Sequence, residues 1–328
     1  MYRIFVTRKI PEVGLQRLRA EKDFDVVVSP KDRVLTRAEL KKGVKGADAI
    51  LSLLTDRIDG EILDAAGKQL KIVANYAVGF DNVDLAAAKE RRIVVTNTPS
   101  DIVSESVAEH TFALMMAVAH RIVESDTFTK KGKYKGWAPD LLTWTLLQGK
   151  TLGIVGLGRI GAAVARRGVG MGMKIVYHDV KANVEFEQQY QAEYHKTLDG
   201  LLAIADVVSL HVPLLPTTRH LMSTEQFNLM KRTAFLVNTS RGPVVDEKAL
   251  VIALEQQRIA GAGIDVFECE PSIDCDLTDH HELKKMTNVV LTPHTASAAR
   301  EARDAMAVIA VQNIIAVLRG RSAINPAI

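Results

Sequence analysis

Short apolar runs alternate with stretches of helical periodicity along the whole chain. Helical spacing of apolar positions is clear, for example, in residues 11–20 and 37–42. Strands that alternate with helices predict an α/β protein built on parallel sheets. The runs that predict strands span residues 3–7, 24–28, 49–53, 72–75, 93–96, 152–155, 174–178, 206–211, 234–238, 261–265 and 288–291.

Two long helices interrupt this alternation. The first is expected to begin at Ser100 or Asp101, which are good N-cap residues, and to run toward Lys130. The second covers residues 297–319, after the last predicted strand. Six strands are predicted between the two helices, which is the number in a complete dinucleotide-binding sheet. A chain of 328 residues is long enough for that domain and a second one.

The strand at 152–155 ends in a glycine turn that indicates a bound dinucleotide. Gly156 allows the turn, Gly158 lets a diphosphate approach the backbone, and Gly161 lets the following helix pack closely on the strand. The N–H groups of that helix would face the phosphates. Asp179 ends the next strand, where a carboxylate can accept hydrogen bonds from the ribose of NAD and would repel the extra phosphate of NADP. The alternative is a helix-capping glycine turn in an ordinary α/β domain.

This turn opens the second group of strands rather than the first, and its place decides the expected domain order. We expect two doubly wound parallel-sheet domains, with a Rossmann NAD-binding domain at residues 101–295. It would be inserted into a flavodoxin-like domain made of residues 1–100 and 296–328, which would bind the substrate. The last helix would return to pack on that first domain.

Composition narrows the class of protein. Apolar residues make up 47% and charged residues 25% of the chain, as in a soluble globular protein. A net charge of +3 gives no basic face for nucleic acid. The longest uncharged helical run, residues 111–119, is too short to span a membrane. Two cysteines cannot form a disulfide framework, and the N-terminal stretch has no signal-peptide core, so we expect a cytoplasmic protein.

Three late segments place chemically useful side chains after predicted strands, where open α/β sheets bind ligands. Arg241 could fork onto a carboxylate and lie near a carbonyl oxygen, although a surface arginine is the alternative. Asp265 ends a buried strand, and Glu270 and His294 form a candidate pair. A histidine is the natural proton donor near neutral pH, and a carboxylate beside it raises its pKa and holds its tautomer. By contrast, the lone histidines at 110, 120 and 220 are interpreted as structural.

Two weaker signals remain. The turn after residue 75 could bind a carboxylate with the N–H groups of Val78 and Gly79, or it is simply a β/α turn. The cysteines at 269 and 275 and the histidines at 280 and 281 match no zinc spacing, so we expect no metal.

Taken together, these motifs resemble those of the D-isomer-specific 2-hydroxyacid dehydrogenases over essentially the whole chain. The resemblance rests on Gly156-Leu-Gly-Arg-Ile-Gly161, Asn238-Thr-Ser-Arg-Gly242, Asp265-Val-Phe-Glu-Cys-Glu-Pro271 and Pro293-His294. Within the family the chain looks most like the glyoxylate/hydroxypyruvate reductases, through Asn75-Tyr-Ala-Val-Gly-Phe-Asp-Asn-Val-Asp84, Val94-Val-Thr-Asn-Thr-Pro99 and Gly149-Lys-Thr-Leu-Gly-Ile-Val155.

The resemblance implies reduction of a small 2-oxo acid, such as glyoxylate or hydroxypyruvate, to the D-2-hydroxy acid with NADH. Arg241, Glu270 and His294 would be catalytic, with His294 as the proton donor or acceptor. Val78, Gly79 and Arg241 would hold the substrate. A homodimer through the cofactor domains is also implied. The expected cofactor-binding residues are Gly156, Gly158, Arg159, Ile160, Gly161, Asp179, Val212, Pro213, Thr218, Thr239, Ser240, Arg241, Asp265, His294 and Ser297.

Several departures keep alternatives open. Relatives usually have glycine where Ala296 stands and tend to have glycine at Trp144, and the loop at 272–279 is unusual in length and charge. The preferred acid is left open, including 2-ketogluconate, and use of NADP is less expected than use of NAD. A phosphite dehydrogenase would need lysine where Val78 stands, because a buried dianion requires a cation. An NAD-sensing corepressor-like protein is the remaining alternative, and such proteins carry long disordered tails that this sequence does not show.

Overall fold

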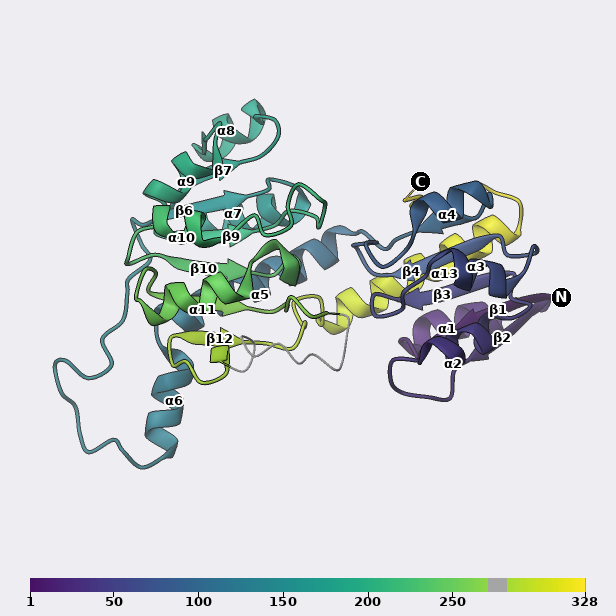
Figure 1. Cartoon of the computed structure of the whole chain (residues 1–328), viewed down its shortest axis with the longest axis horizontal. Coiled ribbons are helices and arrows are strands. Elements are labelled where there is room, and N and C mark those ends of the chain that lie inside the picture. Colours follow the sequence, from purple (N-terminus) through teal and green to yellow (C-terminus); the bar gives the residue numbers. More distant parts are fainter. Residues whose placement is uncertain (271–281, 328) are drawn as a thin grey trace. The chain divides into compact units, whose positions relative to one another are not determined.

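A computed structural model describes residues 1–270 and 282–327. The chain divides into two compact units, one made of Met1–Val103 with Ala298–Ile328 and the other of Ser104–Ser297. Figure 1 shows the yellow C-terminal helix α13 (Arg300–Leu318) among the purple and blue elements of the first unit. The second unit is therefore an insertion in the first, as the sequence predicts for the fold class.

The sheet of the first unit is parallel throughout and has the strand order β2-β1-β3-β4-β5. This is the flavodoxin-like order. Its strands are β1 (Tyr2–Val6), β2 (Phe24–Val28), β3 (Ala49–Leu53), β4 (Ile72–Tyr76) and β5 (Val94–Thr96). The helices α1 (Glu12–Arg19), α2 (Arg37–Val44), α3 (Gly60–Ala66) and α4 (Leu85–Glu90) connect them.

Two apolar cores cover this sheet, one on each face. Its strands are apolar on both faces because both faces are buried. Side chains of α1 and α13, such as Leu15 and Met306, form one core with Ile4 and Ile72. Side chains of α2 and α3, such as Leu40 and Ile62, form the other. The starts of α2, α3 and α4 are defined by polar caps at Thr36, Asp59 and Asp84.

The second unit has a parallel sheet of seven strands in the order β12-β11-β10-β9-β6-β7-β8. The direction of winding reverses between β6 and β9, which makes it a doubly wound dinucleotide-binding sheet. The sequence predicts six of these strands and misses β8, which has only two residues. The strands are β6 (Thr151–Val155), β7 (Lys174–His178), β8 (Glu193–Tyr194), β9 (Val207–Leu210), β10 (Phe235–Asn238), β11 (Gly261–Ile264) and β12 (Val289–Leu291).

Helices cover both faces of this larger sheet. One apolar core includes α5 (Asp101–Ala119) and α7 (Arg159–Gly170), and the other includes α9 (Leu198–Ile204), α10 (Thr224–Leu229) and α11 (Glu247–Glu255). A short helix, α8 (Val184–Tyr190), precedes β8, and one 3₁₀ turn, η1 (Gly242–Val244), follows β10.

The prediction of one continuous helix toward Lys130 is wrong. The chain leaves the helical conformation at Arg121, whose φ is 54°, and α6 (Ile122–Lys130) begins a separate helix. None of the α6 residues is buried, whereas α5 packs in the core. The last helix also begins at Arg300, later than predicted.

Helix α5 is longer than the run of residues 111–119 suggests. The helix has 19 residues, and an 18-residue window within it has a mean hydropathy of 1.2, which meets the length and composition of a membrane span. In the structure 61% of that segment is buried inside the protein, as is usual for a helix at the centre of a folded core.

Candidate active site

The glycine turn after β6 is crowded on one side and open on the other. Gly156 has a φ of +93°, and a Cβ placed there would lie 2.9 Å from the carbonyl of His211. A Cβ on Gly161 would lie 2.0 Å from the carbonyl oxygen of Gly156, so helix α7 can approach the turn only with glycine there. At Gly158 a Cβ would meet nothing within 4 Å. This open position at the start of α7 fits a diphosphate held by backbone N–H groups.

Asp179 is fastened to the same turn. Its carboxylate accepts a hydrogen bond of 2.7 Å from the Leu157 N–H and another of 2.6 Å from the Val180 N–H. The hydroxyl of Tyr194, on the strand that sequence analysis missed, donates to the Asp179 carbonyl over 3.2 Å. The carboxylate is thus fixed beside the glycine turn, where it fits the ribose of a dinucleotide.

The segment that carries Arg241 is shaped by its neighbours. Asn238 accepts hydrogen bonds from the Ser240 N–H and hydroxyl, and its side-chain amide donates to the Arg241 carbonyl over 3.0 Å. A Cβ on Gly242 would lie only 1.8 Å from the carbonyl oxygen of Phe267. The loop that leads to Glu270 therefore lies directly against the residue after Arg241.

His294 and Glu270 form the pair that the sequence predicts. His294 Nδ1 contacts Glu270 Oε2, and the other carboxylate oxygen of Glu270 accepts from the Phe267 N–H over 3.0 Å. The side chains are 23% and 26% exposed, so they are partly shielded but still reachable. Because Nδ1 faces the carboxylate, Nε2 is the nitrogen that can exchange a proton with a ligand.

Asp265 is fully buried and organises the loop that bears His294. It accepts hydrogen bonds from the Thr292 hydroxyl (2.5 Å), the Thr295 N–H (2.8 Å) and the Ala296 N–H (2.8 Å). Burial alone would raise the pKa of this carboxyl. Hydrogen bonds from His110, Thr292 and the two N–H groups outweigh burial and hold the pKa below its usual value. Asp265 is therefore an ionised acceptor.

Strand register brings these segments to one edge of the sheet. Asn238 of β10 pairs with Ile264 of β11, and Ile264 pairs with Leu291 of β12. Arg241, Asp265 and His294 follow these three strands, all at their carboxyl ends. Ligands of open α/β sheets bind at that edge.

The other expected cofactor residues lie at the same edge, but several of their hydroxyls are already engaged. Thr218 Oγ1 donates to the Pro213 carbonyl over 2.6 Å and stabilises the loop after Val212. Thr239 Oγ1 lies 2.9 Å from Thr111 Oγ1 on α5. Arg159 and Ile160 open helix α7, and Ser297 closes the second unit.

Val78 and Gly79 follow β4 in the first unit. The Val78 carbonyl accepts from the side chain of Asn97 over 2.7 Å, and the Gly79 carbonyl accepts from Asn75 over 3.0 Å. The turn is thus held through its carbonyl groups.

His110 is interpreted from the sequence as a structural residue, and the sequence gives no indication of a role for Thr292. His110 Nε2 on α5 lies 3.0 Å from Thr292 Oγ1 and 3.4 Å from Asp265 Oδ1. His110 and Thr292 are 182 positions apart in the sequence, and no local motif indicates that they are in contact.

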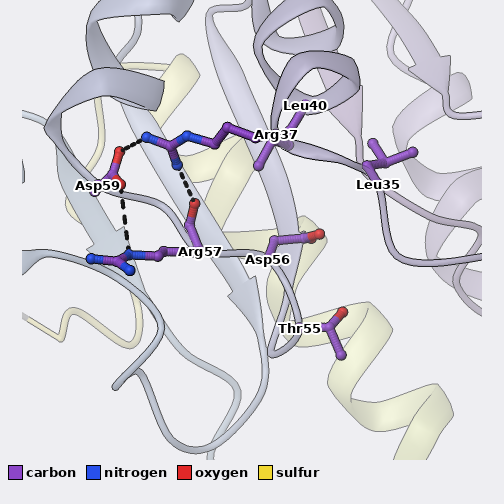
Figure 2. A pocket seen from close by; sticks show the side chains of 7 residues that line it. All are labelled: Leu35, Arg37, Leu40, Thr55, Asp56, Arg57 and Asp59. Carbon is purple, nitrogen blue, oxygen red and sulfur yellow. Dashed lines mark hydrogen bonds and ion pairs between the residues drawn. The ribbon is translucent and has the colours of Figure 1, made fainter. Parts of the chain in front are cut away.

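A pocket of about 430 Å³ lies elsewhere, in the first unit (Figure 2). Arg37 there is paired with Asp59 at 2.5 Å and with Glu61 at 2.6 Å. Because these carboxylates already satisfy the guanidinium, the pocket is poorly suited to an anionic substrate. It is lined by Leu35, Arg37, Leu40, Thr55, Asp56, Arg57 and Asp59.

Among residues 1–270 and 282–327, no cluster of three or more metal-ligating side chains is found. Three of the four residues weighed as ligands in the sequence, Cys275, His280 and His281, lie outside the described residues, as does the loop at 272–279.

Three features define a dinucleotide-dependent oxidoreductase of the Rossmann type. They are the glycine turn after β6, the acidic residue after β7 and the His–Glu pair at the carboxyl edge of the sheet. The family model described as "D-isomer specific 2-hydroxyacid dehydrogenase, NAD binding domain" matches residues 112–296. The chain belongs to the D-isomer-specific 2-hydroxyacid dehydrogenase family, as the sequence motifs predict.

Relatives support this assignment over the full length. A glyoxylate reductase of Korarchaeum cryptofilum is 49% identical over 319 residues, which cover 97% of this chain and 93% of the relative. An NADPH-dependent glyoxylate/hydroxypyruvate reductase of Sinorhizobium meliloti, solved with NADP and malonate, has a TM-score of 0.84 at 33% identity and covers 99% and 96% of the two chains. A D-lactate dehydrogenase of Aquifex aeolicus, solved with NAD and lactic acid, has a TM-score of 0.84 at 31% identity over 97% and 96%.

Proposed function

We propose that the protein reduces a small 2-oxo acid, glyoxylate or hydroxypyruvate, to the corresponding D-2-hydroxy acid with NADH. The observation that carries the proposal is the contact between His294 Nδ1 and Glu270 at the carboxyl edge of the sheet. The identity of 49% to a glyoxylate reductase favours this substrate class.

We expect the chain's own residues to bind both reactants. The turn from Gly156 to Gly161 would receive the diphosphate, and Asp179 would bind the adenosine ribose. NADH, when bound, supplies the hydride. The substrate carboxylate would be held by Arg241 and by the N–H groups of Val78 and Gly79.

Arg241 and His294 would act on the carbonyl group of the substrate. The guanidinium of Arg241 polarises the ketone, which stabilises the negative charge that develops on its oxygen. His294 then donates a proton from Nε2 to that oxygen, and Glu270 stabilises the imidazolium before the transfer. One hydride and one proton are added, so the product is a 2-hydroxy acid.

NAD is the proposed cofactor, because a fixed carboxylate at Asp179 would repel the 2′-phosphate of NADP. Its two hydrogen bonds to the Leu157 and Val180 N–H groups hold it beside the turn and would hinder its withdrawal. The NADPH-dependent relative leaves NADP as the alternative that direct measurement must test.

A homodimer through the cofactor domains is part of the proposal, with the cytoplasm as its location. In the segment after α5, large apolar side chains have unusually high exposed fractions: Trp137 is 82%, Leu146 58% and Trp144 53% exposed. Trp144 also packs against His120, with ring centroids 4.0 Å apart and ring planes inclined by 35°. An apolar surface of this kind is characteristic of a protein interface.

The decisive experiment measures oxidation of NADH and of NADPH with a panel of 2-oxo acids that includes glyoxylate, hydroxypyruvate and 2-ketogluconate. His294→Asn is the matched variant, because asparagine tolerates the φ of 54° at this position. We expect turnover to fall by roughly 100-fold or more, the usual size of a lost general acid, while NADH still binds. Wild-type turnover in the variant, or no turnover of any acid by the natural chain, would contradict the proposal.

A further inference from the structure

We propose that His110 is a positioning residue, which holds the loop that carries His294 in its working place. The inference rests on the proposed function for its catalytic consequence, but its structural part stands on the contacts of His110 alone.

The direction of the hydrogen bonds follows from Asp265. An ionised carboxylate only accepts, so the Thr292 hydroxyl must donate its proton to Asp265 across 2.5 Å. The hydroxyl oxygen is then left to accept from His110 Nε2 at 3.0 Å. His110 therefore carries its proton on Nε2, which faces the Thr292 hydroxyl and, at 3.4 Å, Asp265 Oδ1 itself. A donor relay thus runs from His110 to Asp265, mainly through Thr292.

The relay ends in the loop of residues 292–296. Asp265 receives the N–H groups of Thr295 and Ala296, and its carbonyl accepts from the His294 N–H over 2.8 Å. Every one of these bonds flanks His294, whose left-handed backbone needs such support. A change at His110 would thus reach the loop through Thr292 and Asp265.

Helix α5 presents two further side chains to the same edge of the sheet. Ser106, one turn before His110, donates to the Ala296 carbonyl over 2.9 Å. Thr111, the next residue, lies 2.9 Å from the hydroxyl of Thr239, two residues before Arg241. One face of α5 therefore contacts the segments that bear both His294 and Arg241, and His110 lies at its centre.

The consequence for the reaction is a loss of turnover with little loss of cofactor binding. His110 contacts neither the glycine turn nor Asp179 in any described hydrogen bond or ion pair. A displacement of the His294 imidazole by about 1 Å is enough to lower turnover roughly 100-fold. The dinucleotide site, in contrast, is held by the separate bonds around Asp179.

The test compares His110→Phe, which keeps the ring but cannot donate, with His110→Gln, which keeps an N–H donor. We expect His110→Phe to lower kcat about 10- to 100-fold with a KM for NADH within about twofold of the natural value. His110→Gln should restore most of kcat. His195→Gln is the matched control: this histidine pairs with Glu193 on the edge strand, and its replacement should leave kcat unchanged.

A second measurement is independent of turnover. The imidazole Nδ1 proton of His294, which reports the contact with Glu270, can be followed by nitrogen-edited NMR of the whole chain and assigned with His294→Asn. We expect its resonance to shift or to be lost through exchange with water in His110→Phe and to return in His110→Gln. If the natural protein reduces no 2-oxo acid, the proposed function fails, while this resonance still tests the role of His110.

Thr292→Val interrupts the relay from its other end and keeps the proposal testable if His110→Phe does not fold. We expect the same loss of kcat and the same change in the His294 resonance. Natural kcat and an unchanged resonance in either folded variant would overturn the inference. So would a His110→Gln variant as impaired as His110→Phe, because the restored N–H donor would then have no effect on kcat.

Discussion

Replacing Gly158 with alanine should separate cofactor binding from folding. Gly158 precedes helix α7 with a φ of −75°, a conformation open to any L-residue, and an added Cβ would meet no atom of the protein within 4 Å. The methyl group would instead occupy the open side of the turn. If the diphosphate approaches the backbone there, the substitution removes the space it needs.

The expected change in folding stability is small, whereas the expected change in NADH affinity is large. Alanine is a poorer N-cap than glycine by up to about 1 kcal/mol, but it lowers the entropy of the unfolded chain by about 0.4–1 kcal/mol. The melting temperature should therefore move by only about 2–4 °C. Forcing a methyl group into an occupied space costs about 1–3 kcal/mol, which corresponds to a Kd for NADH roughly 5- to 150-fold higher.

The assay is a fluorescence titration with NADH, run beside thermal unfolding followed by circular dichroism. Gly170→Ala is the matched control, because it lies at the end of the same helix and its Cβ also meets nothing within 4 Å. We expect natural NADH affinity and unchanged or slightly raised stability in the control. A Gly158→Ala variant with a natural Kd would refute the placement of the diphosphate at this turn.

Two further predictions concern pH and assembly. Burial lowers the pKa of His211 to about 3, so the folded state keeps it neutral while the unfolded chain takes up a proton below about pH 6.5. Its stabilising effect is complete above pH 6.5 and falls with decreasing pH, by about 2 kcal/mol at pH 5. Urea unfolding at pH 7 and pH 5 should show a smaller loss in His211→Gln, and an equal loss would contradict this. Light scattering should give twice the chain mass of 36.0 kDa, and Trp137→Ser should shift it toward a single chain. A natural protein with the mass of one chain would exclude the dimer.

The sequence predicts the fold well where apolar runs are long and fails where a structure depends on distant partners. Strand β8 has two residues, Glu193 and Tyr194, and pairs with β7 at the edge of the sheet, so it leaves no apolar run to detect. The break between α5 and α6 arises from the left-handed conformation of Arg121, a residue with no local signal for ending a helix. Both features depend on tertiary context that overrides local preference.

The candidate site shows the same division. Gly156, Asp179 and His294 follow strand ends, a position that periodicity alone can locate. The relay through His110 depends instead on helix α5 meeting a loop 182 residues later, and a lone histidine in a helix gives no indication of that contact. The short distances between the hydroxyl groups of α5 and the loops at the edge of the sheet result from tertiary packing. No single segment of the sequence encodes that packing.

The close contact between Gly242 and the Phe267 carbonyl restricts the substitutions that this protein can accept during evolution. A side chain at 242 would push the Phe267 peptide away and, with it, Glu270, whose carboxylate is bound to the Phe267 N–H. Substitutions in the two loops should therefore be tolerated mainly in compensating pairs. New substrate preferences would then arise more readily from positions outside this contact, where one residue can vary without its neighbour.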